Sequence, residues 1–312
     1  MPDAKVDSTL SQPLAELVGR TIAGRYRIQR LLGRGGIGAV YEAVQLQTGN
    51  LLAIKVLLPG RANAHQLTER FKREAKAASI LDHPNIIEVL DLVAEDDELY
   101  LVMELLRGQS VGTELHAGAL QPRRTLVIAR QVLEALAYAH GNGMVHRDLK
   151  PDNIMVVTVG EPGREYERVK LLDFGLVKLV GDAARELGND KLTQTGIVFG
   201  TPAYMAPEQA LGRAVDGRTD LYSLGIAIFE MLTGRTPFRS PDPVTLTRMQ
   251  VSAPAPTLAT VAFGRPWCTP EMEALIARAL AKQPADRYAD AAEMTAALDL
   301  AFSSLDHLPA GM

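Results

Sequence analysis

The sequence predicts an α+β protein with two unequal parts, a small strand-rich part followed by a larger helical part. Between residues 26 and 57, short runs rich in Val, Ile, Leu and Tyr are separated by glycine-containing turns, which is typical of strands. After Gly108, apolar residues recur at helical spacing over long stretches. The character of the chain changes near Glu104–Gly108, and we expect the two parts to join there.

The first part begins with three expected strands. Their sequences are "YRIQRLL" (26–32), "AVYEAV" (39–44) and "LLAIKVL" (51–57), separated by "GRGGIG" and "QTGN". A helix is expected next, because apolar residues have helical spacing over 68–81 and Pro84 follows its end. Strands return within residues 85–106, on both sides of an acidic turn.

Helices dominate the second part. Helical spacing of the apolar residues covers 123–143, 220–234 and 271–281. Between the first two of these helices, the stretch "TVGEPGREYERVK" (158–170) contains Gly and Pro and predicts an enlarged hairpin turn.

Composition excludes several classes of protein. The 312 residues are 47% hydrophobic and 22% charged with a net charge of −4, which is ordinary for a globular chain and gives no indication of nucleic-acid binding. The single cysteine, Cys268, excludes an intrachain disulfide and a multi-cysteine zinc site, and it favours a reducing, cytoplasmic setting. No apolar run reaches the roughly 18–20 residues that a membrane span needs, and the N-terminus lacks the pattern of a signal peptide.

Glycines 33, 35 and 38 form the pattern G-x-G-x-x-G, which serves two nucleotide chemistries. Between a strand and a helix it binds the pyrophosphate of a dinucleotide, and in a β-hairpin it covers the phosphates of ATP. Here Gly38 leads into another strand, and the charged residue 17 positions later is Lys55, not an acidic residue. Lys55 can extend its charged end to solvent, but a nucleotide phosphate better explains a cation within an apolar run. Glu74, on the expected helix, is its candidate ion-pair partner.

Two segments of the second part decide between these chemistries. They are "MVHRDLKPDNIMVV" (144–157) and "VKLLDFGLVK" (169–178). With the glycine pattern they resemble the eukaryotic-type (Hanks-type) protein kinase family, with phrases similar to bacterial serine/threonine kinases, from about residue 26 to 302. A lone glycine pattern is weak support, but many family motifs occur here in order. These are G-x-G-x-x-G-x-V at 33–40, A-I-K at 53–55, Glu74, H-R-D-L-K-P-D-N at 146–153, D-F-G at 173–175, G-T-P-A-Y-M-A-P-E at 200–208, D-L-Y-S-L-G at 220–225 and Arg287.

The resemblance implies the bilobal protein kinase fold, with a small β-rich N-lobe that has one main helix and a larger α-helical C-lobe. The expected kinase domain covers residues 26–305, with an N-lobe over 26–104, a hinge over 104–108 and a C-lobe over 109–305. A partly flexible leader over 1–25 precedes it, and a tail over 306–312 follows it.

The resemblance also implies the reaction, which is transfer of the ATP γ-phosphate to Ser or Thr hydroxyls of protein substrates. Such a site must position and neutralise the charge of ATP, and glycine amides approach phosphates closely because no Cβ intervenes. By resemblance, Asp148 orients the substrate hydroxyl and Lys150 steadies the γ-phosphate. Lys55 holds the α- and β-phosphates and is aimed by Glu74.

The cofactors that the resemblance implies are ATP and Mg²⁺, with Mn²⁺ as an alternative. The family's metal ligands correspond to Asn153 and Asp173, whose oxygen atoms suit a hard cation. Adenine needs an apolar slot with a few directional hydrogen bonds. The positions that the family uses around the nucleotide are Leu32, Gly33, Gly35, Gly38, Val40, Ala53, Lys55, Met103, Glu104, Leu106 and Met155.

Other matching residues are expected to support the site. Asp220 would brace the turn that carries Asp148. Glu208 would pair with Arg287 and fix the substrate-binding loop, in which Thr201 would form hydrogen bonds. Loss of one partner of such a buried pair costs several kcal/mol, so a substitution there would mimic a catalytic defect.

A regulatory step is also expected. Arg147 is a cation that in related kinases meets a phosphate on the activation loop. The candidate acceptors are Thr193 and Thr195, and Lys178 and Arg70 are candidate phosphate ligands, although a solvated surface cation is an equal interpretation of Arg70. The hypothesis is that trans-autophosphorylation, in a transient homodimer, raises activity.

Two other functions remain open beside a protein kinase. A pseudokinase scaffold would use the same fold for binding alone, but it normally lacks at least one of the three residues Lys55, Asp148 and Asp173. A small-molecule kinase of the antibiotic-phosphotransferase type would lack the loop at 200–208 and the Arg287 partner. A dehydrogenase of the Rossmann type is excluded by the strand after Gly38. The sequence represents either a soluble enzyme or a catalytic piece of a longer protein.

Overall fold

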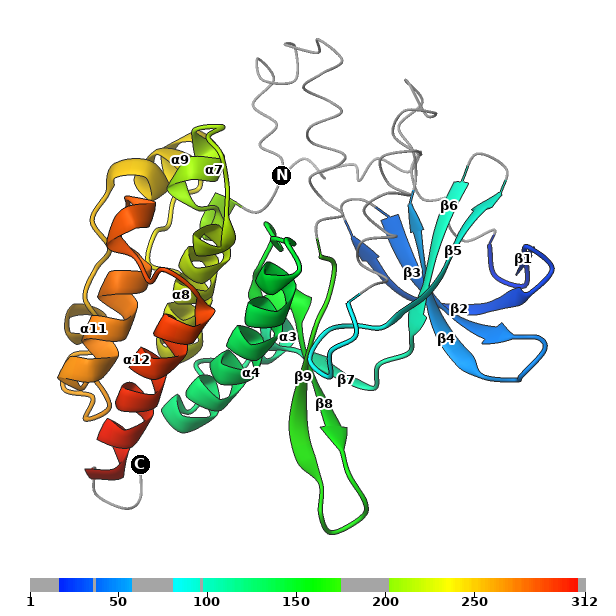
Figure 1. The fold of residues 1–312 in the computed structure, drawn as a ribbon, viewed down its shortest axis with the longest axis horizontal. Helices are drawn as coiled ribbons and strands as arrows, with labels where there is room; N and C mark the ends of the chain where they lie inside the picture. The colour runs from blue at the N-terminus through cyan, green and yellow to red at the C-terminus, as the bar shows by residue number, and fades with distance from the viewer. Residues whose placement is uncertain (1–16, 36–37, 58–80, 96–97, 175–201, 308–312) are drawn as a thin grey trace, which may run out of the picture. The chain divides into compact units, whose positions relative to one another are not determined.

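The structure of the protein, a computed structural model, describes residues 17–35, 38–57, 81–95, 98–174 and 202–307. These residues form two compact units. The first contains the described residues up to Leu57 together with Glu88–Leu106, and the second contains Leu81–Ile87 and the described residues from Arg107 onward. Figure 1 colours the chain from blue at its start to red at its end.

The first unit is an antiparallel sheet. Its strand order is β1-β2-β3-β4-β6-β5, so β6 is inserted between β4 and β5. Strong β formers alternate with turn residues along this stretch, which explains why the chain pairs with itself in hairpins. The strands are β1 (Thr21–Ile22), β2 (Tyr26–Gly35), β3 (Gly38–Gln45), β4 (Leu51–Leu57), β5 (Val89–Glu95) and β6 (Glu98–Glu104).

One face of this sheet carries the hydrophobic core of the first unit. Side chains alternate between faces along a strand, and Tyr41 of β3, Ile54 of β4 and Tyr100 of β6 are fully buried on the same face. Leu17 and Ile22, which precede β2, belong to the same cluster. The segment expected as a leader therefore contributes one short strand and two core side chains.

The second unit begins with a three-stranded antiparallel sheet in the order β7-β8-β9. Its strands are β7 (Gly108–Ser110), β8 (Ile154–Val159) and β9 (Tyr166–Leu171), and the last two form the enlarged hairpin expected at 158–170. Gly108 lies so close to β8 that a Cβ would be 2.1 Å from the Val156 carbonyl oxygen. Only glycine fits at this position. Gly108 also marks the point at which the strand-rich part of the sequence ends and the helical part begins.

Helices form the rest of the second unit, and α4 packs against α8 and α12 around the larger core (Figure 1). Pro122 and Pro270 occupy first turns, where a missing N–H costs nothing. α8 ends at Gly234, whose φ of 73° suits a left-handed cap. The helices are α3 (Val111–Leu115), α4 (Pro122–Gly141), α7 (Pro207–Ala210), α8 (Gly217–Thr233), α9 (Pro243–Ser252), α10 (Leu258–Val261), α11 (Pro270–Ala279) and α12 (Ala291–Ser304), with 3₁₀ turns η2 (Pro151–Asn153), η3 (Pro202–Tyr204), η4 (Pro284–Asp286) and η5 (Leu305–His307).

The α+β prediction is confirmed, with a strand-rich first unit and a helical second unit. The expected strands match β2, β3, β4, β5 and β6, and the expected long helices match α4, α8 and α11. The helix expected over 68–81 falls almost entirely outside the described residues. Within the described ranges, none of the helices has the length and apolar character that crossing a membrane requires.

Candidate active site

The glycine pattern lies in the hairpin of β2 and β3. Gly33 pairs with Val40, and Gly35 pairs with Gly38. Strands thus flank the pattern on both sides, which is the arrangement that covers ATP phosphates and not the strand–turn–helix unit of dinucleotide sites. Leu32, also predicted to contact the nucleotide, is 40% exposed on β2.

Four residues predicted to surround ATP share one face of the first sheet. Val40, Ala53, Lys55 and Met103 alternate with the core residues, so they lie on the face opposite the hydrophobic core. Val40 is the cross-strand neighbour of Lys55, and Ala53 is that of Met103. Lys55 is only 6% exposed. This face therefore combines a buried cation with apolar side chains, as an anionic ligand with an apolar ring requires.

The end of β6 is held by two hydrogen bonds between Glu104 and Glu88. The Glu104 amide donates to the Glu88 carbonyl at 3.1 Å, and the Glu104 carboxylate accepts the Glu88 amide at 2.9 Å. Glu104 and Leu106, the predicted hinge positions, are half-buried at the end of the first unit.

In the second unit, Asp148 is held by two neighbours in sequence. Lys150 Nζ donates to Asp148 Oδ2 at 2.8 Å. Asn153 Nδ2 donates to the Asp148 carbonyl at 2.8 Å and to its Oδ2 at 3.2 Å. The carboxylate is therefore fixed in one orientation by a cation and an amide, which is the preorganisation that a group acting on a substrate proton requires.

The turn before Asp148 is held by Asp220 of α8. Asp220 is fully buried, and its two oxygens accept the amides of His146 and Arg147 at 2.8 Å each. Arg147 has a φ of 67°, a left-handed conformation that costs energy for a non-glycine residue. Gln209 of α7 donates to the Arg147 carbonyl at 2.8 Å. Contacts on both sides thus hold a strained residue beside Asp148.

His146 joins this turn to the segment after β9. Its Nδ1 accepts the Asp148 amide at 3.3 Å, so its Nε2 carries the hydrogen and donates to the Leu172 carbonyl at 2.8 Å. The imidazole also packs on the Phe174 ring, with centroids 4.7 Å apart. The conformation around Asp148 therefore depends on the conformation around Asp173.

Asn153 and Asp173 lie next to the paired ends of one hairpin. Ile154 pairs with Leu171, and the Leu172 amide donates to the Asn153 carbonyl at 2.9 Å. Because Asn153 Nδ2 is directed at Asp148, its amide oxygen is left for another partner. One amide oxygen and one carboxylate fit Mg²⁺, which takes few protein ligands together with substrate phosphates. The described residues contain no cluster of three His, Cys, Asp or Glu side chains that could hold a metal ion.

Met155, predicted to lie below the adenine, is the second residue of β8. It pairs with Ser110 of β7 and Lys170 of β9 and is half-buried. The other predicted residues of this unit belong to the network around Glu208.

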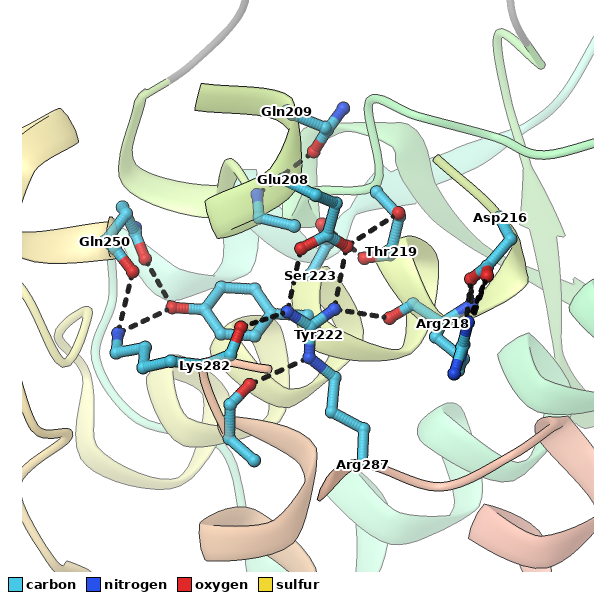
Figure 2. Close-up of polar contacts among 12 residues, drawn as sticks. Glu208, Gln209, Asp216, Arg218, Thr219, Tyr222, Ser223, Gln250, Lys282 and Arg287 are labelled. Atoms are coloured by element: carbon cyan, nitrogen blue, oxygen red, sulfur yellow. Dashed lines mark hydrogen bonds and ion pairs between the residues drawn. The ribbon is translucent and has the colours of Figure 1, made fainter. Parts of the chain in front are cut away.

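Glu208 and Arg287 form a buried, bidentate ion pair (Figure 2). Arg287 Nη1 and Nη2 donate to Glu208 Oε1 and Oε2 at 2.8 Å each. Thr219 also donates to Glu208 at 2.8 Å, and the remaining Arg287 hydrogens reach the carbonyls of Ala281, Arg218 and Lys282. Burial alone would raise the pKa of Glu208, but the hydrogen bonds and charge of Arg287 outweigh burial and hold this pKa below its ordinary value.

Lys282 lies at the edge of the same network (Figure 2). Its ammonium donates to the Tyr222 hydroxyl at 3.0 Å and to the Gln250 carbonyl at 2.9 Å, and it lies 4.1 Å from the Phe238 ring centroid. No carboxylate is among these contacts. Burial and, to a smaller extent, the charge of Arg287 together lower the pKa of Lys282 to about 8.

The lowered pKa of Lys282 predicts a pH dependence of stability. In the folded protein Lys282 loses its proton near pH 8, whereas in the unfolded chain it does so at its ordinary, higher pKa. The unfolded chain binds more protons in this window, so stability rises with pH above about 8 relative to a Lys282→Met variant. The melting temperature of the wild type, measured against that of the variant from pH 7 to pH 9.5, should increase on the order of 2 °C. A constant difference across this range would contradict the assignment.

Six predicted residues fall outside the described ranges. They are Arg70, Glu74, Lys178, Thr193, Thr195 and Thr201. Conversely, sequence reasoning missed His140, whose Nε2 lies 2.8 Å from Asp220 Oδ2, as well as Gln209, Gln250 and Lys282. Gln209 directly follows the family motif at 200–208, and this position is the feature of the sequence that could have indicated its role.

Comparisons with known proteins identify the family of the chain. The family described as "Protein kinase domain" matches residues 26–300. The chain therefore belongs to the protein kinase family, whose members use ATP and a divalent metal.

Within that family the chain is similar to bacterial serine/threonine-protein kinases. It is 44% identical to Serine/threonine-protein kinase pkn3 of Myxococcus xanthus, over 91% of this chain and 51% of that protein. It is 38% identical to Serine/threonine-protein kinase PrkC of Bacillus subtilis, over 92% and 42%. Among solved structures, the PknI kinase domain of Mycobacterium tuberculosis has a TM-score of 0.70 at 28% identity, over 91% of this chain and 98% of that one. The chain thus spans about half the length of the curated relatives that it matches.

Proposed function

We propose that the protein is a serine/threonine protein kinase, which transfers the γ-phosphoryl group of ATP to Ser and Thr hydroxyls of protein substrates. The observation that carries this proposal is the Asp148 carboxylate, held by Lys150 at 2.8 Å and by Asn153 at 3.2 Å. Both curated relatives described above carry the name serine/threonine-protein kinase, and this supports the same reaction.

In this reaction a substrate hydroxyl oxygen forms a bond to the γ-phosphorus, and the bond from that phosphorus to the β–γ bridging oxygen breaks. Asp148 orients the hydroxyl and accepts its proton, and ADP leaves. Lys150, already beside Asp148, balances negative charge on the transferred group. Asn153 and Asp173 would hold the divalent cation, Mg²⁺ or Mn²⁺, which when bound neutralises phosphate charge.

The residues of the first unit are proposed to bind the nucleotide. Backbone amides of the hairpin at Gly33, Gly35 and Gly38 approach the phosphates, and Lys55, aimed by Glu74, holds the α- and β-phosphates. In this unit the nucleobase is proposed to contact Val40, Ala53 and Met103 and to form hydrogen bonds with the backbone of Glu104 and Leu106. Met155 of β8, in the second unit, is a separate proposed contact of the nucleobase. Leu32 covers it from β2. The buried cation beside the side chains of Val40, Ala53 and Met103 supports these roles.

The proposed substrates are proteins, not small molecules. The buried Glu208–Arg287 pair holds α7, directly after η3 and thus beside the segment that would accept a peptide, and Thr201 is proposed to form hydrogen bonds in that segment. We infer that the chain acts in the cytoplasm, binds no nucleic acid and forms a homodimer only transiently, in line with its net charge of −4 and single cysteine.

Incubation of the protein with labelled ATP and Mg²⁺, in the presence of mixed histones or of an aminoglycoside, tests the proposal. Label should appear on phosphoserine and phosphothreonine of the histones and disappear when EDTA removes the metal. Label confined to an aminoglycoside would indicate a small-molecule kinase instead. Nucleotide binding without any transfer would indicate a pseudokinase.

Regulation by phosphorylation is a second part of the proposal. Among the described residues, Arg147 Nε is buried without a hydrogen-bond partner. A donor left unsatisfied in this way costs free energy, and a phosphate would supply the missing acceptor. We propose that this phosphate is carried by Thr193 or Thr195 after trans-autophosphorylation. Lys178 and Arg70 are the proposed additional ligands.

The Thr193→Ala/Thr195→Ala variant should therefore be less active than the phosphorylated wild type. One lost charge-assisted hydrogen bond corresponds to about tenfold in rate, so transfer to histones should fall at least about tenfold. Mass spectrometry of the wild type should find phosphate on one of the two threonines. Full activity of the double variant, or an active wild type without phosphate there, would refute this regulation.

A further inference from the structure

Gln250 of α9 is a polar side chain that is fully buried. Its Nε2 donates to the carbonyl oxygens of Pro202 at 3.1 Å and Ala203 at 2.6 Å. Its Oε1 accepts the Tyr222 hydroxyl at 2.7 Å. Both hydrogens of the amide are thus directed at the backbone of the η3 turn, which lies 47 and 48 residues away in the sequence.

The η3 turn is connected to the loop that carries Asp148. Ser223 of α8 donates to the Tyr204 carbonyl at 2.8 Å, so side chains of α8 and α9 hold three consecutive carbonyls of the turn. Gln209 of α7, a few residues further on, donates to the Arg147 carbonyl directly before Asp148. The turn is thus joined through α7 to the loop that carries Asp148, the carboxylate proposed to receive the substrate hydroxyl.

Gln250 is held at its main chain as well as at its side chain. Lys282 donates to the Gln250 carbonyl at 2.9 Å and to the same Tyr222 hydroxyl that donates to Gln250 Oε1 (Figure 2). The amide is therefore fixed from two directions, and rotation of Gln250 away from η3 would break contacts at both ends.

We propose that Gln250 is a positioning residue for the protein substrate, which acts by fixing the backbone of Pro202 and Ala203. The inference rests on the proposed kinase function. Without the Gln250 amide, two carbonyls near the substrate lose their hydrogen-bond donor and must rotate to find another. The contacts of Gln250 named above include neither Asp148 nor Asn153, so binding of ATP and the transfer step are preserved.

The test is a comparison of steady-state kinetics for wild type and Gln250→Met. Methionine keeps the length and the apolar part of the side chain but donates no hydrogen bond. The KM for mixed histones should rise about fivefold to tenfold, as the loss of one or two net hydrogen bonds predicts, while the KM for ATP and kcat stay within about twofold.

Two further variants separate positioning from general destabilisation. Tyr222→Phe keeps the Nε2 donors on Pro202 and Ala203 and removes the hydroxyl that donates to Gln250 Oε1 and accepts from Lys282, so a smaller rise in histone KM is expected. This variant also tests the inference if Gln250→Met does not fold. Gln283→Met is the matched control, because Gln283 is exposed on the chain next to Lys282 and should leave all constants unchanged.

The outcomes separate the inference from the function on which it rests. A selective rise in histone KM in Gln250→Met, with a smaller one in Tyr222→Phe, supports the inference. Equal losses in kcat and in both KM values, or an unchanged histone KM in a folded variant, overturn it while the kinase function stands. Absence of transfer by the wild type overturns both.

Discussion

An Asp148→Asn variant should lose about 10²–10⁴-fold in phosphoryl transfer, which is the range that general-base catalysis contributes. The asparagine amide has nearly the same shape as the carboxylate but cannot accept a proton. It would also present hydrogens toward Lys150 Nζ, which donates to Asp148 Oδ2 at 2.8 Å. Radioactive transfer to histones measures the loss, and thermal unfolding should show a folded protein.

The matched control for this loss is Asp152→Asn in the same loop. Asp152 is exposed, whereas Asp148 is held by Lys150 and Asn153. Its amide variant should keep activity within about twofold of the wild type, the level expected for a surface substitution. Equal activity of Asp148→Asn and wild type would remove the basis of the proposed mechanism, and an equal loss in both variants would indicate a nonspecific effect of charge.

That Lys150 and Asn153 lie near Asp148 could be predicted from the sequence, because the three residues are close together in the chain. Lys150 and Asn153 follow within five positions, and one tight loop brings them to the carboxylate. That Lys55 and Ala53 share one face of the sheet could also be predicted from the sequence, because side chains alternate between the two faces along a strand. This part of the site can therefore be predicted from the local periodicity and the local motifs of the sequence.

Contacts between segments that are distant in the chain could not be predicted from local sequence patterns. Gln250 lies in a helix whose sequence "PVTLTRMQVS" contains several polar residues, and nothing local distinguishes the buried one from those facing solvent. Its burial results from the packing of α9 beside η3 and α8, which depends on the whole unit. The left-handed φ of Arg147 could not be predicted from the local sequence either. The hydrogen bonds that hold this conformation come from Asp220 and Gln209, which lie far along the chain.

Replacement of Arg287 by Met should be the most destabilising of the substitutions considered. It leaves Glu208 buried without its cation, and removal of one partner of a buried pair costs about 3–5 kcal/mol in the free energy of unfolding. Arg123→Met is the control: Arg123 pairs with Asp306 on the surface, where both side chains are about half exposed, and such a pair contributes at most about 1 kcal/mol. Urea unfolding followed by circular dichroism measures both.

The pH dependence of this loss identifies its cause. In the wild type Arg287 holds the pKa of Glu208 below its ordinary value, so the pair stabilises the protein above that ordinary value and this stabilisation is lost as pH falls through the lowered pKa. In Arg287→Met, burial, the largest influence on the Glu208 pKa, is opposed only by hydrogen bonds from a backbone amide and from Thr219, so the pKa rises relative to the wild type. The variant therefore takes up a proton more readily and is relatively more stable at pH 5 than at pH 8. Adding Glu208→Gln should recover part of the loss at pH 8 and little at pH 5. A loss that is independent of pH and not relieved by Glu208→Gln would mean that the Arg287 contacts with Ala281, Arg218 and Lys282, and not the ion pair, hold this region together.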